Sequence, residues 1–175
     1  FSLKVSGLRG GHSGEDINKN RASANQLLAQ VLNYIQQEIS IRLSCLRGGT
    51  VRNAISRNAE ASFVCRKDQT GLLRERFKSI FKIIQTQYGY QESGLALTLE
   101  EICGKPMRVI SCSETLTSLR FLVSLPQGVM AMSSENPGLV ETSSNTGIIE
   151  LTEAGFVFIS SQRSAKLTRL EEITE

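Results

Sequence analysis

The hydrophobic positions of the N-terminal half follow two spacings, a period of about two residues, typical of strands, and one of about 3.6, typical of helices. Apolar and polar residues alternate along 1–8, 41–45, 59–66 and 95–99. Apolar residues recur every three or four positions along 22–40 and 71–88. The order strand, helix, strand, strand, helix, strand predicts an α+β fold. Its core is a ferredoxin-like split βαβ unit, an antiparallel sheet with helices mainly on one face.

The C-terminal half carries further elements of both kinds. We expect a helix over about 113–124, strands near 139–143, 147–151 and 156–161, and a closing helix from about residue 163. These strands would extend the antiparallel sheet beyond four. No low-complexity linker divides the 175 residues, so we predict a single domain, 1–175. The first residues already alternate and no Met precedes them, which favours a domain excised from a larger protein.

Charge and cysteine content narrow the classes of function. The formal charge is +3, and the basic residues are too dispersed for a nucleic-acid stripe. The cysteines, Cys45, Cys65, Cys103 and Cys112, are widely spaced and form no C-x-x-C pair. We expect them to be buried thiols of a reducing compartment, the cytoplasm. No apolar run is as long as a membrane span.

The single histidine, His12, lies in a glycine-rich turn directly after the first strand. A histidine in such a turn is presented to its surroundings rather than packed. It could be a general base, a metal ligand, an oxyanion binder or an ordinary surface residue, and the residue types alone leave these open. The neighbouring Ser13 lacks the closing glycine of a G-x-S-x-G elbow, so we expect a turn or capping hydroxyl.

Two more polar residues are candidates for ligand binding. Asn53 follows a Gly-Gly break, where a primary amide can both donate to and accept from a peptide; the alternative is a turn residue bonding its own backbone. Arg163 ends a predicted strand and could hold a carboxylate at two points; the alternative is an ion pair with Glu171 or Glu172. The acidic residues are scattered, and one histidine gives no recognisable zinc ligand set, so we predict no metal site in this chain.

Three motifs follow one another along the chain: 7–17 (GLRGGHSGEDI), 48–55 (GGTVRNAI) and 138–145 (GLVETSSN). Together they resemble the Xaa-His dipeptidases, also called aminoacyl-histidine dipeptidases or peptidase D. These are cytoplasmic zinc exopeptidases related to carnosinase and carboxypeptidase G. In that family an inserted lid, or dimerisation, domain interrupts the catalytic domain. The resemblance covers nearly the whole chain and implies that this chain is the lid.

The resemblance also implies a division of labour. Two zinc ions, their ligands and a glutamate general base would lie in the flanking catalytic domain, where the zinc ions polarise the attacking water. The isolated chain would then hydrolyse no dipeptide, and the complete protein would be a homodimer. His12 would stabilise the tetrahedral oxyanion. Asn53 and Arg163 would bind the dipeptide backbone and its terminal carboxylate, with Arg66, at a comparable strand end, as the alternative for the carboxylate.

Two positions depart from the family pattern, and one other class of function competes. Ser56 replaces a usual proline, which we expect to loosen the turn that presents Asn53. Asn20 replaces a frequent glycine, and asparagine can still adopt left-handed geometry. The competing hypothesis is a stand-alone ferredoxin-like module that binds a small ligand or RNA. RNA binding needs exposed aromatic residues on the central strands, whereas we expect Phe156 and Phe158, like Phe63, in the core.

Overall fold

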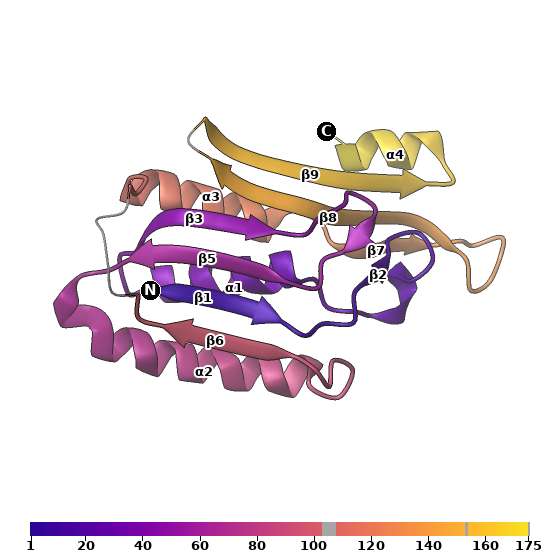
Figure 1. Cartoon of the computed structure of the whole chain (residues 1–175). Helices are drawn as coiled ribbons and strands as arrows, with labels where there is room; N and C mark the ends of the chain where they lie inside the picture. The colour runs from indigo at the N-terminus through magenta and orange to yellow at the C-terminus, as the bar shows by residue number, and fades with distance from the viewer. Residues whose placement is uncertain (103–107, 153, 175) are drawn as a thin grey trace.

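The computed structural model describes residues 1–102, 108–152 and 154–174 (Figure 1). The first half contains the elements β1 (Ser2–Ser6), α1 (Ala24–Gln36), β3 (Arg42–Gly48), β5 (Ala59–Val64), α2 (Thr70–Tyr88) and β6 (Ala96–Glu100). Its strands lie in the order β6-β1-β5-β3, and each neighbouring pair is antiparallel. This is the split βαβ arrangement that the sequence predicts, so the expected core of the fold is confirmed.

The second half extends the sheet. It contains α3 (Cys112–Ser124), β7 (Gly128–Met132), β8 (Val140–Thr152), β9 (Gly155–Ser164) and α4 (Leu167–Thr174). β8 joins β3 through two register pairs, Arg47 with Glu150 and Gly48 with Ile149, and pairs with β7 and β9 along the rest of its length. In the described part of the chain the result is a seven-stranded antiparallel sheet.

Some predicted boundaries in this half are wrong. The two strands expected at 139–143 and 147–151 are one strand, β8, because the polar residues between them are buried and pair with β9. β7 was not predicted. The closing helix begins at Leu167, whereas Arg163 lies within β9.

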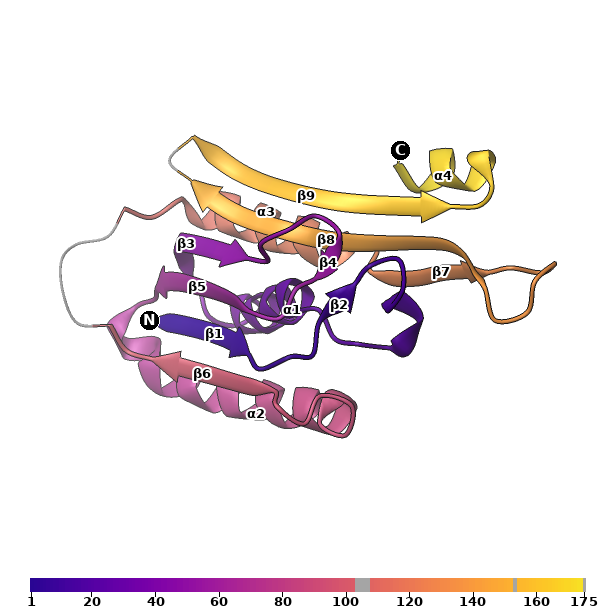
Figure 2. The same cartoon turned by 45° about the vertical axis from the view of Figure 1, so that its right-hand side comes forward.

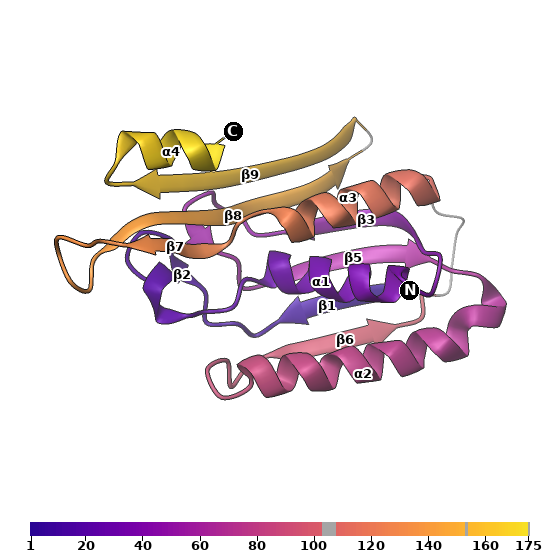
Figure 3. The same cartoon turned by 180° about the vertical axis from the view of Figure 1, so that it is seen from behind.

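The core lies between the sheet and three helices. Figure 3 shows α1, α2 and α3 together on one face of the sheet, with α1 between the other two. The leucines Leu27, Leu28 and Leu32 of α1 are fully buried against the strands. Each contributes about 1.5–3 kcal/mol by burial. No described helix is long and apolar enough to cross a membrane.

The other face of the sheet is open and polar. Lys4, Glu60, Arg47 and Glu150 lie in register across four neighbouring strands, so that positive and negative side chains alternate. Arg47 and Glu60 form an ion pair with an N–O distance of 2.5 Å. No described helix lies over this face between β1 and β3 (Figures 1 and 3), and the candidate site lies at one end of it.

Two expectations about burial are wrong. Cys45 and Cys65 are half-buried and Cys112 is exposed; Cys103 lies outside the described residues. Burial still raises the pKa of the Cys45 and Cys65 thiols. The sequence predicts Phe158 in the core, but it is 40% exposed because β9 is an edge strand; the ring of Phe121 from α3 packs on it, at 4.8 Å between centroids.

Candidate functional site

A short two-stranded ribbon outside the main sheet carries the candidate site (Figure 2). It consists of β2 (Gly11–His12) and β4 (Ala54–Ile55), paired antiparallel with His12 opposite Ala54. Beyond the ribbon, the Ser13 N–H donates to the Asn53 carbonyl oxygen at 2.8 Å. Two motifs that lie about forty residues apart in the sequence are therefore tied together by backbone hydrogen bonds.

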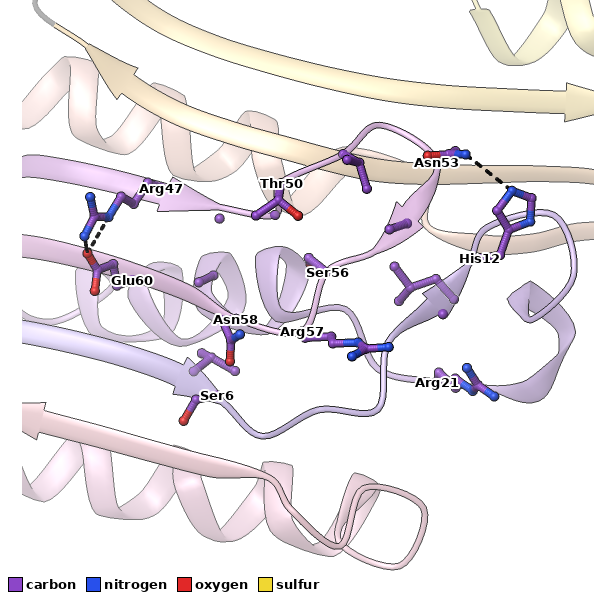
Figure 4. A pocket seen from close by; sticks show the side chains of 18 of the residues that line it. Ser6, His12, Arg21, Arg47, Thr50, Asn53, Ser56, Arg57, Asn58 and Glu60 are labelled. Atoms are coloured by element: carbon purple, nitrogen blue, oxygen red, sulfur yellow. Dashed lines mark hydrogen bonds and ion pairs between the residues drawn. The ribbon is translucent and has the colours of Figure 1, made fainter.

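The His12 side chain is half-buried, and its ring is oriented by the turn itself. Ring Nδ1 accepts a hydrogen bond from the Gly14 N–H at 3.3 Å, so a neutral ring carries its proton on Nε2. Nε2 lies 3.4 Å from the Asn53 side-chain amide (Figure 4). Rotation of that amide presents its Oδ1 as an acceptor for the Nε2 proton. The ring thus directs a hydrogen-bond donor toward Asn53.

Asp16 fixes the main chain of His12 rather than its ring. Its Oδ2 accepts from the His12 N–H at 2.9 Å, while Oδ1 accepts from Lys19 Nζ at 2.7 Å and lies 3.2 Å from Arg21 Nη2. The hydrogen bond from Lys19, followed by that from the His12 N–H, lowers the pKa of the Asp16 carboxyl. Gly11 has a φ of +149°, which residues with side chains rarely adopt, and a Cβ there would also lie 2.5 Å from Asp16 Oδ2, so this turn favours a glycine.

The loop that carries Asn53 is held by a residue that the sequence did not single out, Asn145 of β8. Asn145 is 1% exposed, and its Nδ2 donates to the carbonyl oxygens of Arg52 at 3.2 Å and Ala54 at 3.0 Å. Its Oδ1 accepts from Gln127 Nε2 at 3.2 Å. The two carbonyls flank Asn53, so its backbone is fixed while its side chain stays exposed. Asn145 is the last residue of the third sequence motif, which was its only signal.

The glycines of the motifs allow the Asn53 loop to pack directly on β8. A Cβ on Gly147 would overlap the Arg52 carbonyl, and one on Gly49, whose φ is +72°, would overlap the Gly147 carbonyl. Asn25 of α1, 2% exposed, donates from Nδ2 to the carbonyl oxygens of Thr146 at 3.0 Å and Gly147 at 3.3 Å. Close backbone contact, and not loop flexibility, explains why these positions are glycines.

Arg163 reaches the same place from the last strand. It lies opposite Ser143 in the β8–β9 pair, and its guanidinium covers Gly14. A Cβ on Gly14 would overlap Arg163 Nη1 and lie 3.2 Å from His12 Cε1. Within the described residues Arg163 forms no ion pair with Glu171 or Glu172, and Glu172 is bound to Arg169 at 2.7 Å.

Arg66 lies elsewhere. It follows the end of β5 that pairs with Arg42, whereas the ribbon adjoins the opposite end, where Ala59 pairs with Gly48. Its guanidinium donates to both carboxylate oxygens of Asp68, at 3.1 and 2.7 Å. The geometry therefore favours Arg163 over Arg66 as the group beside His12.

The departures from the family pattern prove harmless to the loop. Ser56 is 3% exposed; its Oγ accepts from the Asn25 N–H and contacts Ser23 Oγ, both at 3.0 Å, and its carbonyl accepts from the Ala24 N–H at 2.9 Å. The hydroxyl ties the loop to the start of α1, which opposes the expected loosening. Asn20 takes the left-handed geometry that we expected, with φ of 52°.

A cavity of about 970 Å³ connects the ribbon with the open face of the sheet, and His12 and Asn53 line it (Figure 4). Arg57 also lines it; its side chain lies over Gly10 and pairs with no described acid. Ser13 is 2% exposed, and its hydroxyl has no hydrogen-bond partner among the described residues. It is therefore neither the turn hydroxyl we expected nor an accessible nucleophile.

The fold and the site define a class of protein, an α+β domain that presents polar side chains from a glycine-rich ribbon. A family model described as a peptidase dimerisation domain, of the M20 peptidases, matches residues 3–92. The chain belongs to this family, which confirms the family resemblance seen in the sequence. His12 and Asn53 fall inside the matched residues, whereas Arg163 falls outside them.

Two relatives extend the likeness over nearly the whole chain. The chain is 35% identical over 153 residues to a cytosol non-specific dipeptidase of Escherichia coli strain K12, covering 87% of this chain and 31% of that protein. The crystal structure of an aminoacylhistidine dipeptidase from Vibrio alginolyticus matches with a TM-score of 0.93 and 32% identity, covering 99% of this chain and 35% of that one. This chain spans about a third of the length of each.

Proposed function

We propose that this chain is the lid, or dimerisation, domain of a larger dinuclear zinc dipeptidase of the M20 family. The substrate class is Xaa-His dipeptides, and the location is the cytoplasm. The printed names of the two relatives support the reaction, and the one-third coverage supports an excised domain at 1–175. One observation carries the assignment of roles: His12, Asn53 and Arg163 come from separate segments and converge around Gly14 and the ribbon.

In this proposal His12 is a hydrogen-bond donor to the oxyanion of the tetrahedral intermediate. The Gly14 N–H occupies Nδ1, which leaves the Nε2 proton available for a substrate oxygen. The contact between Nε2 and the Asn53 amide is long, 3.4 Å, so a substrate oxygen can replace it at small cost. A preorganised donor of this kind stabilises the charge that develops on the carbonyl oxygen.

Asn53 and Arg163 supply the substrate contacts. The Asn53 amide can accept from and donate to the peptide backbone of a dipeptide. Arg163 offers a planar guanidinium, which matches a terminal carboxylate at two points. Its lack of an acidic partner among the described residues leaves it free for that carboxylate, and the extended reach from β9 sets it beside the His12 ring.

The described residues of this chain do not form a zinc centre. The residues that the structure describes include no group of three or more His, Cys, Asp or Glu side chains placed to hold a metal ion. We therefore assign the zinc ligands and the glutamate general base to the flanking catalytic domain of the same protein. The role of this chain is to bind and orient the dipeptide and to hold a donor at its carbonyl oxygen.

Replacement of His12 by alanine in the complete enzyme tests the proposed role. We expect kcat to fall by about 10²- to 10³-fold, the usual effect of removing one oxyanion donor, with the zinc content unchanged. Steady-state kinetics and metal analysis of the same preparation measure both. Loss of zinc from His12→Ala would instead make His12 a ligand and contradict the proposal.

The isolated chain provides a second test. Because it offers no metal site among its described residues, we expect no dipeptide hydrolysis even with added zinc. A coupled assay for released histidine, run beside the complete enzyme as a positive control, measures this. Robust zinc-dependent turnover by the 175-residue chain would refute the division of labour between the two domains.

A further inference from the structure

Glu92 is a buried carboxylate that the proposed chemistry does not use. It lies in the turn between α2 and β6 and is 1% exposed. Its Oε2 accepts a hydrogen bond from the Arg9 N–H at 2.8 Å, and its Oε1 accepts from the Ala22 N–H at 3.0 Å. These two donors mark the ends of residues 9–22, the segment that carries His12, which we call the His12 loop. One side chain therefore holds both ends of this loop.

The surroundings of Glu92 favour its two hydrogen bonds to the backbone. No described Lys or Arg forms an ion pair with Glu92. The two backbone N–H donors therefore offset the free-energy cost of burying its carboxylate. The positive end of the α1 dipole, two residues beyond Ala22, adds to this stabilisation. The turn lies directly against the chain that leaves β1. A Cβ on Gly7, whose φ is +76°, would overlap the Gly94 carbonyl, so the two backbones touch there.

We propose that Glu92 is a positioning residue that keeps the His12 imidazole opposite Asn53. The middle of the His12 loop is held by Asp16 and by pairing with β4, and Glu92 closes its two ends. Without the carboxylate, the buried Ala22 N–H and the part-buried Arg9 N–H lose their acceptors, and the loop opens to give them water. The consequence for catalysis rests on the proposed function, whereas the consequence for loop geometry does not.

Amide hydrogen exchange of the chain itself tests the geometric part. We expect Glu92→Ala to speed exchange at Arg9 and Ala22 by at least about tenfold, because both lose their acceptor. Glu92→Gln keeps one acceptor oxygen and should release mainly one of the two amides. Amides of β5 should keep their protection, and Glu75→Gln, an exposed glutamate on α2, is the matched control. Unchanged exchange at both amides in the two Glu92 variants would overturn the proposal.

Kinetics of the complete enzyme test the catalytic part. We expect Glu92→Gln to lower kcat by about tenfold or more per folded, metal-loaded molecule, because small displacements of a reacting group are costly. A purely structural role would lower the melting temperature and the folded fraction but leave that kcat unchanged, and such a result would overturn the proposal. If the unaltered enzyme hydrolyses no dipeptide, the proposed function fails, while hydrogen exchange still decides whether Glu92 holds the loop.

Discussion

At the scale of single residues, Gly14 is the position at which the His12 ring and the Arg163 guanidinium come together. Its N–H binds the His12 ring, and the Arg163 guanidinium occupies the space that a side chain at this position would fill. Its φ lies outside the left-handed region that strains other residues, so alanine is compatible with the backbone here. Gly14 is therefore required for the room it leaves to Arg163.

Gly14→Ala separates these two functions of the position. The added methyl group displaces Arg163 but keeps the N–H that orients His12. We expect KM for dipeptides to rise by about tenfold, the loss of one charge-assisted contact, with a small change in the melting temperature. Kinetics of the complete enzyme measure it, with Gly71→Ala as control, since a Cβ there meets nothing within 4 Å. An unchanged KM would separate Arg163 from substrate binding.

The sequence indicates some of these residues and not others, for physical reasons. His12 stands out because it lies in a glycine-rich turn, and Asn53 because it follows a Gly-Gly break; side chains at such turns are presented to their surroundings. Their distance from Arg163 depends on how β9 docks, which no local pattern encodes. Glu92 looks like an ordinary surface residue, and Asn145 is marked only by its place in the third motif, because burial of a polar side chain with satisfied hydrogen bonds leaves no mark in the periodicity.

At the scale of elements, the helices and strands of the first half are predictable because the period of their apolar residues matches the side that each element buries. The apolar face of α1 and the alternation of β1 and β5 both follow from burial against one core. β8 was divided in two because Ser144, Asn145 and Thr146 interrupt the apolar pattern, yet all three are at most 2% exposed. Their backbone pairs with β9 and the Asn145 side chain binds the Asn53 loop, so tertiary contacts override the local signal.

The His12 turn is the element for which we predict a pH effect. The pKa of Asp16 is lowered below its unfolded value of about 3.9, so its contribution is fully present above that pH and is lost as pH falls through the folded pKa. We expect the His12 amide resonance to shift with a midpoint below about 3.9. NMR titration measures it, and Asp16→Asn, which cannot titrate, should abolish the shift. A midpoint above about 3.9 would contradict the lowered pKa of Asp16.

At the scale of the whole molecule, the proposed homodimer needs a surface to which a second copy can bind. α1 lies between α2 and α3, which leaves little of it free (Figure 3). β9 is an edge strand in the described part of the chain, and its Val157 and Ile159 are 44% and 40% exposed. An exposed apolar edge is a ready surface for pairing across a two-fold axis. As the family is one of dimerisation domains, we expect the homodimer to form along β9.

Lysine substitutions on β9 test whether the dimer forms along this strand. In the complete protein, Val157→Lys combined with Ile159→Lys should shift the proposed dimer to monomer, because opposed lysines repel and apolar burial is lost. Light scattering with size-exclusion chromatography over a range of concentrations measures the mass. Ile83→Lys, on the exposed side of α2 at 54% exposure, is the matched control. If the doubly substituted chain remains a dimer, the contact lies on another surface.

The short pairing between β3 and β8 also bears on the order in which the candidate site forms during synthesis. His12 and Asn53 leave the ribosome before Arg163, which emerges with the β8–β9 hairpin. In the described residues this hairpin is joined to β3 through two register pairs. A nascent chain can therefore build its glycine-rich ribbon early, yet it gains the guanidinium only when β8 and β9 dock. The surface that we propose binds the dipeptide is therefore complete only after β9 has been synthesised.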